Sequence, residues 1–298
     1  HAVKFSLRNK RINRVLIVDS VSGEEKTIEA AYVVNAAGAW SRKVAALAGI
    51  PLKMVYSKGS LLATQQRITK RVVNRLREAS DGDIAVPGGT VSILGTPSVR
   101  IYSLRQARPT IAEVDHIIDE VAAMLPEVES VRYIRAYCGV RPLTGTSTIG
   151  DDREVSRGFA LIDHATDGID NFLTITGGKF TTFRLMAEKA ANLICHNLGV
   201  RAPCKTAIVP LPVQSASRWT QPGSAPRFWM QKKDPDDILL CECEMVPQSA
   251  IDHLVDTVSK NHRKPSLKSI SRRSRIGKGP CQGTFCSLRV AAYLYDCS

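Results

Sequence analysis

The sequence predicts a mixed fold, of the α/β class with α+β character, on three observations. Short β-branched runs are separated by glycine and proline, as at Ile84–Val86 before Pro87-Gly88-Gly89, which is typical of an antiparallel sheet. Residues 110–125 carry apolar side chains at helical spacing. A strand, a pair of glycines and a helix follow one another at residues 171–194, an order typical of α/β units. The length of 298 residues indicates about two domains.

The elements are predicted from β-branched runs, turn residues and helix caps, taken in chain order. Thr110 and Glu113 form a capping box at the start of the clearest helix, and Pro126 ends it. We expect its apolar residues to face the core: Ile111, Val114, Ile118, Val121 and Leu125. The predicted strands are Arg14–Asp19, Thr27–Asn35, Leu52–Tyr56, Ser60–Ala63, Ile84–Val86, Thr90–Leu94, Val131–Cys138, Phe159–Asp163 and Asn171–Thr176.

Two further helices are predicted beside glycine-containing turns. The strand Thr27–Asn35 runs into Ala36–Ser41, and a short helix follows as far as Leu47. The strand Asn171–Thr176 ends at Gly177-Gly178-Lys179. The helix after it carries one apolar face and is closed by Gly199; this face comprises Phe183, Met186, Ala187, Ala190 and Ile194.

A change in composition after residue 202 divides the chain into two domains. Residues 203–237 contain six prolines and little periodicity, which indicates a linker or an irregular extension. We therefore expect one domain over residues 1–202, with a sheet at roughly 52–140, and a small helical domain over 238–298. No stretch is long and apolar enough for a membrane span.

The net charge of +13, from 41 Lys and Arg against 28 Asp and Glu, suits an acidic partner or a phosphorylated substrate. Eight of the cations fall between Ser259 and Lys278, a stretch without Asp or Glu. A solvated basic face is the alternative interpretation. Nucleic acid is not expected as a partner, because the aromatic content is 6% and neither zinc-finger spacing nor an aromatic RNA-binding strand is present.

Gly177-Gly178-Lys179 indicates an anion site. Glycines let the backbone approach a ligand, a helix N-terminus offers unpaired N–H groups, and lysine adds charge. The spacing excludes a Walker A loop, and a plain turn remains the alternative. Arg141, in Gly-Val-Arg-Pro, is a second anion-binding candidate, although a surface arginine is equally consistent. Arg157 is more ambiguous, and His164 is the one histidine retained as a candidate.

Cysteine spacing predicts a metal centre near the C-terminus. Cys241-Glu242-Cys243 and Cys281-x4-Cys286 supply four thiols from two loops, as a [2Fe–2S] cluster or a tetrahedral Zn²⁺ needs. The Cys-x2-Cys spacing of a zinc knuckle is absent, so the cluster is favoured over zinc and over no metal. Nearby cations offset the negative charge of a thiolate-bound cluster: Arg272, Arg273, Arg275 and Lys278. The remaining cysteines are expected to be packing residues: Cys138, Cys195, Cys204 and Cys297.

Taken together, these segments resemble the A subunit of anaerobic, FAD-dependent glycerol-3-phosphate dehydrogenase. The cysteine-rich tail resembles the [2Fe–2S] domain related to bacterioferritin-associated ferredoxin, and the resemblance spans nearly the whole chain. The stretches that carry it are Val33–Trp40, Ser92–Thr96, Arg135–Leu143, Thr174–Arg184, Cys241–Cys243 and Gly279–Cys286.

The resemblance implies a partial FAD/NAD(P)-binding domain with an antiparallel substrate-cap sheet, followed by the small helical [2Fe–2S] domain. It implies FAD contacts at Ala36, Ala37, Gly38, Trp40, Gly177, Gly178, Lys179, Phe180 and Thr181. Glycerol 3-phosphate would be held by Arg141, Arg157 and Lys179, with Arg141 and Lys179 acting in catalysis, and the cluster by Cys241, Cys243, Cys281 and Cys286. Dihydroxyacetone phosphate is the implied product. Electrons would reach menaquinone through partner subunits, which would hold this cytoplasmic protein at the inner membrane.

The sequence departs from the family pattern in three ways, one being that the phosphate-binding arginine expected before His1 is not part of it. No G-x-G-x-x-G fingerprint follows a strand, so we expect a C-terminal fragment that is inactive alone. Lys58-Gly59-Ser60 is followed by Leu61 where related aerobic enzymes have histidine, which leaves the general base unassigned. Two alternatives remain: a flavin enzyme that oxidises an amino acid or a 2-hydroxy acid, and a non-catalytic iron–sulfur electron-transfer subunit.

Overall fold

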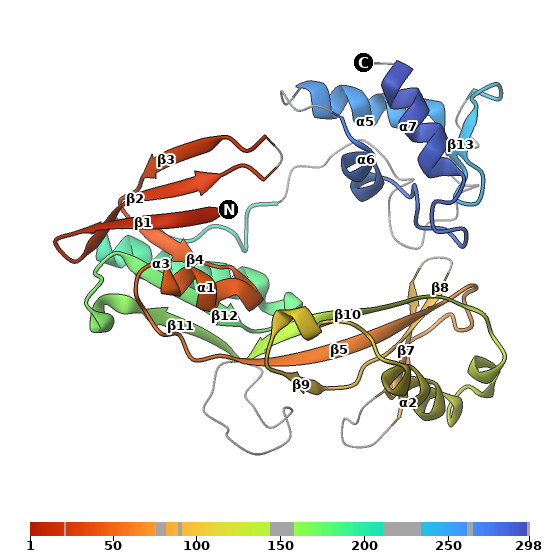
Figure 1. Ribbon diagram of the computed structural model, residues 1–298, viewed down its shortest axis with the longest axis horizontal. Helices are drawn as coiled ribbons and strands as arrows, with labels where there is room; N and C mark the ends of the chain where they lie inside the picture. The colour runs from red at the N-terminus through yellow and green to blue at the C-terminus, as the bar shows by residue number, and fades with distance from the viewer. Residues whose placement is uncertain are drawn as a thin grey trace. The chain divides into compact units, whose positions relative to one another are not determined.

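The computed structural model describes residues 1–20, 22–75, 82–88, 91–143, 158–210, 234–260 and 265–296 (Figure 1). The chain forms two compact units. Unit 1 comprises His1–Gly59, Pro97–Arg108 and Cys138–Pro212; unit 2 comprises Ser60–Thr96, Pro109–Tyr137 and Val213–Ser298. Most of the predicted linker, residues 211–233, lies outside the described residues.

The chain begins with a three-stranded antiparallel sheet, β1 (Ala2–Arg8), β2 (Arg11–Val18) and β3 (Glu25–Glu29), in the order β1-β2-β3. The prediction of one strand over Thr27–Asn35 is wrong, because β3 ends at Glu29 and β4 (Val33–Asn35) joins another sheet. Every residue of β3 is solvent-exposed, whereas Asn35 at the end of β4 is buried. One continuous strand could not satisfy both environments.

The second sheet has the order β11-β12-β4, with β11 at Phe159–Asp163 and β12 at Phe172–Gly177. Strand β12 is antiparallel to β11 and parallel to β4, pairing Thr174 with Asn35. Leu173 and Ile175 pack with helix α3 (Phe183–Asn197), whereas Phe172 packs with a separate apolar cluster. This cluster contains Phe5, Ile12, Ala45, Ile50, Leu52 and Ile169. The predictions of both strands, and of a helix after Lys179, are confirmed.

A larger sheet has the order β10-β5-β8-β7-β6, with β9 also paired to β5. Strand β5 is continuous across Lys58-Gly59, where the sequence predicted a break between two strands. The Lys58 side chain is buried and its Nζ donates to the Arg108 carbonyl oxygen at 2.8 Å, so the strand accommodates a charged residue. The strands are β5 (Val55–Thr64), β6 (Val73–Asn74), β7 (Ile84–Gly88), β8 (Val91–Gly95), β9 (Val99–Ile101) and β10 (Tyr133–Leu143).

Helix α2 (Ile111–Ala122) starts at the predicted capping box: the Thr110 N–H donates to Glu113 Oε2 at 2.8 Å, and the Glu113 N–H donates to Thr110 Oγ1 at 3.4 Å. The predicted core face is partly wrong. Ile117 and Val121 are fully buried, whereas Ile111 is 81% exposed. Ile111 opens the helix with its side chain in solvent, whereas Glu113 in the same turn is buried.

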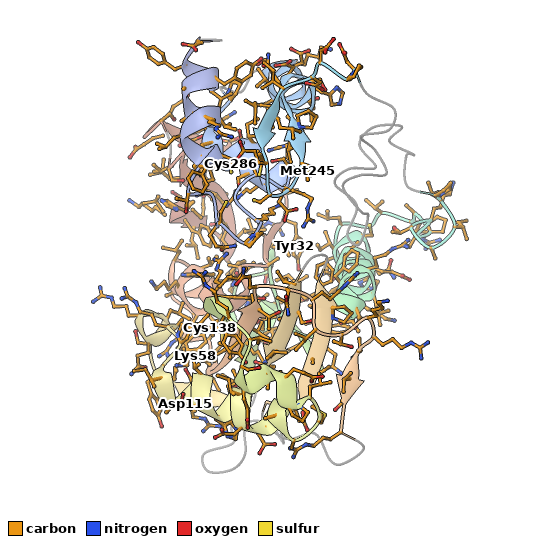
Figure 2. The ribbon with its side chains drawn as sticks, turned by 90° about the vertical axis from the view of Figure 1, so that its right-hand side faces the viewer. Tyr32, Lys58, Asp115, Cys138, Met245 and Cys286 are labelled. Carbon is orange, nitrogen blue, oxygen red and sulfur yellow. The ribbon has the colours of Figure 1, made fainter. Side chains whose placement is uncertain are left out.

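The C-terminal part has its own apolar core, which includes Ile251, Ile270, Ile276 and Val290. Its elements are β13 (Leu239–Cys241), β14 (Val246–Pro247), α5 (Gln248–Lys260), α6 (Leu267–Arg273) and α7 (Cys286–Asp296). Figure 2 labels Met245, just before β14, and Cys286 at the start of α7. Short helices complete the described chain: η1 (Gly38–Trp40), α1 (Ser41–Ala46), η2 (Leu104–Gln106), η3 (Pro126–Glu129), η4 (His164–Asp167) and η5 (Phe180–Thr182). Among the described residues, no helix combines the length and the hydropathy that crossing a membrane requires.

Candidate functional site

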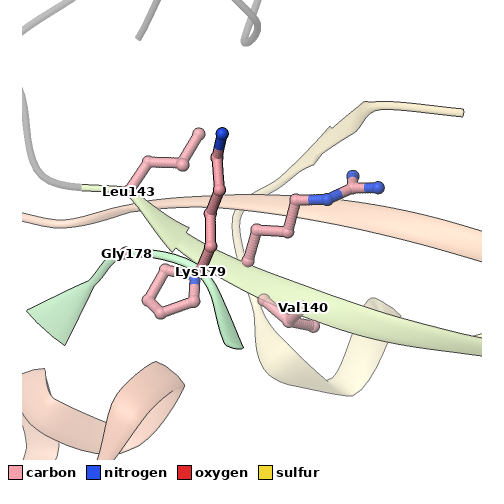
Figure 3. Close-up of a pocket in the computed structure, with 6 residues that line it drawn as sticks. Val140, Leu143, Gly178 and Lys179 are labelled. Carbon is pink, nitrogen blue, oxygen red and sulfur yellow. The ribbon is translucent and has the colours of Figure 1, made fainter. Parts of the chain in front are cut away.

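A cavity of about 410 Å³ in unit 1 contains two of the predicted anion-binding cations. Strand β10 contributes Val140–Leu143, and the turn after β12 contributes Gly178 and Lys179. Figure 3 shows the Lys179 side chain extended past β10, which carries Val140 and Leu143. The structure therefore brings Arg141 and Lys179 to one cavity, although they are far apart in the sequence.

The turn that carries Lys179 depends on two glycines. Gly177 and Gly178 have φ values of +77° and +72°, a region that other residues adopt at a cost. A Cβ on Gly177 would lie 2.8 Å from the Gly158 carbonyl oxygen, and one on Gly178 would lie 2.6 Å from Met186 Sδ. The Gly178 N–H donates to that same Gly158 oxygen at 3.0 Å. The turn is thereby fixed against β11 and α3.

Lys179 is exposed at the start of the helical segment η5–α3. Its backbone N–H donates to Thr182 Oγ1 at 3.1 Å, and the Thr182 hydroxyl donates to the Lys179 carbonyl oxygen at 2.9 Å. Phe180, next along the chain, is 88% exposed and its ring stacks on Phe183 at 5.4 Å between centroids. These contacts fix the backbone of Lys179, which lines the cavity.

Arg141 lies half-buried on β10, and its Nη1 donates to the Pro97 carbonyl oxygen at 3.2 Å. This bond directs the guanidinium from β10 toward the segment before β9. Arg141 and Lys179 place two positive groups around one cavity, an arrangement that favours a dianionic ligand such as a phosphate ester. Arg157, the third predicted substrate residue, lies outside the described residues.

The turn after β4 carries the other predicted cofactor contacts. Strands β4 and β12 are parallel neighbours, so the turns that follow them leave the same edge of the sheet. Ligands of α/β sheets bind at this carboxyl edge. Ala36 and Trp40 are exposed there, and Gly38 has a φ of +57° with no atom within 4 Å of the place a Cβ would occupy. The predicted contacts at residues 36–40 and 177–181 therefore share one edge.

Asn35 fixes the start of this turn. Its side chain is buried, and its Nδ2 donates to the Ser41 carbonyl oxygen at 2.9 Å and to Thr174 Oγ1 at 3.1 Å. Its Oδ1 accepts the Ala37 N–H at 3.3 Å. Asn35 thus holds both ends of the turn and anchors them to β12.

His164 belongs to the same network rather than to the cavity. Its ring is fully buried, with Nε2 2.8 Å from Thr174 Oγ1 and Nδ1 2.7 Å from Asp167 Oδ2. The ring also stacks on Phe172 at 4.8 Å. The Thr174 hydroxyl can accept from Asn35 and donate to Nε2, while Nδ1–H donates to Asp167, which satisfies every polar atom of the network. This histidine therefore supports β12 and is not placed to exchange a proton with a ligand in the cavity.

Two buried hydroxyls lie near this edge: Ser41 Oγ at the start of α1 and Thr176 Oγ1 on β12 have no hydrogen-bond partner within the described parts of the chain. Buried polar groups without a partner are uncommon, and an ordered water, an ion or a functional role accounts for such groups. No pattern in the sequence points to these hydroxyls or to the Asn35–Thr174–His164 network.

The predicted metal ligands approach one another in the C-terminal part. Cys243 Sγ lies 3.8 Å from Cys241 Sγ and 3.5 Å from Cys281 Sγ, and Cys286 is close enough to act electrostatically on Cys241. Within the described ranges, no set of three or more His, Cys, Asp or Glu side chains has the arrangement of a ready metal site. The thiol separations nevertheless show that the two cysteine pairs meet.

The pKa values of three of these thiols shift in different directions. Burial raises the pKa of Cys241 and, to a smaller extent, the pKa of Cys243. Burial also acts to raise the pKa of Cys281, but hydrogen bonds from the backbone N–H groups at Gly283, Thr284 and Phe285, and from Cys243, outweigh it and lower this pKa. Among Cys241, Cys243 and Cys281, the pKa is therefore lowered only at Cys281, which favours the thiolate form that a metal ligand requires.

The chain is similar in sequence to known proteins over most of its length. The chain is 38% identical to the A subunit of anaerobic glycerol-3-phosphate dehydrogenase of Escherichia coli K12, over 94% of this chain and 55% of that protein. It is 35% identical to the A1 subunit of the anaerobic glycerol-3-phosphate dehydrogenase of Haloferax volcanii, over 90% of this chain and 49% of that protein. The chain thus spans about half the length of the curated relatives it matches.

The fold is shared with the X-ray structure of glycerol-3-phosphate dehydrogenase from Bacillus halodurans complexed with FAD. The TM-score is 0.57 at 21% identity, and the match covers 95% of this chain and 50% of that one. The family model described as FAD dependent oxidoreductase matches residues 1–193, nearly two thirds of the chain. By this match, the chain belongs to the family of FAD-dependent oxidoreductases.

Proposed function

We propose that the intact protein oxidises sn-glycerol 3-phosphate to dihydroxyacetone phosphate in an FAD-dependent reaction. The observation that carries this proposal is the cavity lined by both Arg141 and Lys179, which suits a phosphate dianion. The similarity to the A subunits of anaerobic glycerol-3-phosphate dehydrogenases supports it. The chain spans about half the length of these relatives, so the reaction is proposed for the intact protein.

The residues at the sheet edge fit FAD. The turns after β4 and β12 expose glycine backbone, and the hydroxyls of Ser41 and Thr176 are buried without a partner in the described structure. The contacts would come from Ala36, Ala37, Gly38, Trp40, Gly177, Gly178, Lys179, Phe180 and Thr181. When bound, FAD supplies the two-electron acceptor for the hydride that leaves C2 of the substrate.

The chain's own cations bind and orient the substrate. Arg141 offers a planar guanidinium that can hold two phosphate oxygens, and Lys179 offers a point charge from the adjacent turn. With the phosphate held, the C2 hydroxyl is presented in one orientation. Arg157 would add a third cation. The group that accepts the hydroxyl proton is unassigned, since His164 is engaged with Thr174 and Asp167.

The four clustered cysteines would hold a [2Fe–2S] cluster, with Zn²⁺ as the alternative. These residues fit such a group. The backbone around Cys281 donates hydrogen bonds to its sulfur, and Gly279 packs so closely on Cys243 that a larger side chain would not fit there. When bound, the cluster would supply one-electron transfer, and partner subunits would carry the electrons to a quinone, which is menaquinone in the family that the sequence resembles. The partner subunits would hold the protein peripherally on the cytoplasmic face of the inner membrane.

A substrate comparison tests the proposal on a version extended to the length of the relatives. We expect this version to oxidise glycerol 3-phosphate in preference to sarcosine and 2-hydroxyglutarate, because those substrates lack a phosphate. A preference for either of them would support the alternative of an amino-acid or 2-hydroxy-acid oxidising enzyme. If flavin is absent and only iron–sulfur absorption is seen, the protein is an electron-transfer subunit.

A further inference from the structure

An ion pair is buried beside the clustered cysteines. The Glu244 carboxylate follows Cys243 directly, is fully buried and accepts a hydrogen bond from Arg275 Nε. The Arg275 side chain is 18% exposed. A buried carboxylate is costly unless it is paired and hydrogen-bonded, because burial removes its hydration. Arg275 supplies that pairing, so loss of the arginine would leave a buried charge uncompensated beside the cysteines.

The ion pair links the two segments that carry the cysteines. Glu244 ends the segment with the first cysteine pair, whereas Arg275 precedes Cys281 in the second. The second segment packs directly on the first: a Cβ on Gly279 would lie 2.5 Å from Cys243 Sγ and 2.9 Å from Glu244 Cγ. The two segments therefore approach as closely as a glycine backbone allows.

The backbone around Arg275 is itself fixed. Ser274 Oγ donates to the Ile270 carbonyl oxygen at 2.8 Å and accepts the Ile276 N–H at 3.1 Å. Ile270 and Ile276 are fully buried in the apolar core of this part. Arg275 therefore extends from a rigid corner, and its guanidinium position is set by the core rather than by solvent.

We propose that the Glu244–Arg275 ion pair is a positioning element that holds the two cysteine pairs within reach of one metal centre before metal binds. It acts through geometry, since its two charges largely cancel. The inference rests on the proposed metal site, and the approach of Cys243 Sγ to Cys281 Sγ, 3.5 Å apart, can be tested separately on the chain prepared without metal.

The experiment compares wild type with Arg275→Lys, Arg275→Gln and Arg289→Gln in the whole chain. Arg275→Lys keeps the charge but removes the guanidinium geometry. Arg289 pairs with Glu242 at 2.9 Å, beside the same cysteines but with side chains 44% and 64% exposed, so Arg289→Gln is the matched control. If Arg275→Gln fails to fold, as judged by circular dichroism, Arg275→Lys still decides the question because Glu244 keeps a cationic partner.

Two readouts are measured. The first is the rate at which diamide oxidises Cys243 and Cys281 of the metal-free chain to a disulfide, with the diamide reduced to its hydrazine, followed by peptide mapping. The second is zinc affinity, together with the iron retained after anaerobic reconstitution with ferrous iron and sulfide. We expect Arg275→Lys to form the disulfide several-fold more slowly and to bind zinc about tenfold more weakly. Arg289→Gln should match wild type.

Wild-type values for Arg275→Lys in both readouts would overturn the inference, since the charge alone would then suffice. An equal effect of Arg289→Gln would overturn it as well. A wild-type chain that binds neither zinc nor iron would refute the metal site, and the disulfide rate would still report on the positioning.

Discussion

At the scale of single residues, Lys179 and Arg141 both line the cavity described in unit 1. Local sequence is sufficient to predict both as anion-binding candidates. Lys179 follows two glycines at a helix start, and Arg141 lies among turn residues. That they share a cavity depends on the packing of β10 beside the turn after β12, which no local pattern encodes.

Replacing Lys179 with glutamine should weaken phosphate recognition. A hydrogen bond to a charged group contributes about 1.5–3 kcal/mol, so we expect kcat/KM for glycerol 3-phosphate to fall roughly tenfold or more. Steady-state kinetics would measure this kcat/KM on the protein extended to the length of its relatives. Lys189→Gln, at an exposed position further along α3, is the control and should keep the wild-type value. Equal losses in both variants would contradict a specific role for Lys179.

Replacing Gly178 with alanine should destabilise the turn. The φ of +72° costs a residue with a Cβ about 1–2 kcal/mol, and the Cβ would also approach the Phe159 Cβ to 3.2 Å. Urea unfolding should therefore show a free energy of unfolding lower by about that amount or more. Gly139→Ala is the matched control, because Gly139 lies in β10 with no atom within 4 Å of the added Cβ. If Gly178→Ala is as stable as Gly139→Ala, the turn does not require glycine.

At the scale of elements, the network of Asn35, Thr174 and His164 joins the turn after β4 to β12. It could not be predicted from the sequence, since Asn35 and Thr174 are 139 positions apart and meet only through parallel pairing. The position of His164 at a strand end makes it a candidate in the sequence. The structure assigns it to the support of that strand.

Thr174→Val removes the hydroxyl that this network shares and leaves Asn35 Nδ2 one acceptor short. We expect the free energy of unfolding to fall by about 1–3 kcal/mol, and the Ala37 amide to exchange with deuterium faster. Thr174→Ser keeps the hydroxyl and should stay near wild type in both measurements. Equal protection of Ala37 in the two variants would show that the network does not hold the turn.

Other elements show where sequence patterns succeed. The capping box of α2 is predicted correctly because its residues lie three positions apart and interact within one helical turn. Two predictions are wrong. The sequence predicted one strand where β3 and β4 are separate, and two strands where β5 is continuous across Lys58. Both depend on partners distant in sequence: β12 pairs with β4, and the Arg108 carbonyl oxygen accepts from Lys58.

At the scale of the whole molecule, the match to the FAD-dependent oxidoreductase family ends at residue 193, and the clustered cysteines lie beyond it. Because the two cysteine pairs are adjacent in space, we propose a metal centre in the C-terminal part. Motif order is sufficient to predict the family resemblance. The thiol separations and the buried Glu244–Arg275 pair require the three-dimensional structure.

An anaerobic absorption titration of the protein at the full length of its relatives tests the proposed reaction. We predict that glycerol 3-phosphate bleaches the flavin band, whereas glycerol at the same concentration does not, because glycerol lacks the phosphate that Arg141 and Lys179 would bind. A flavin band left unchanged by glycerol 3-phosphate, but bleached by sarcosine or 2-hydroxyglutarate, would contradict glycerol-3-phosphate oxidation as the function of this protein.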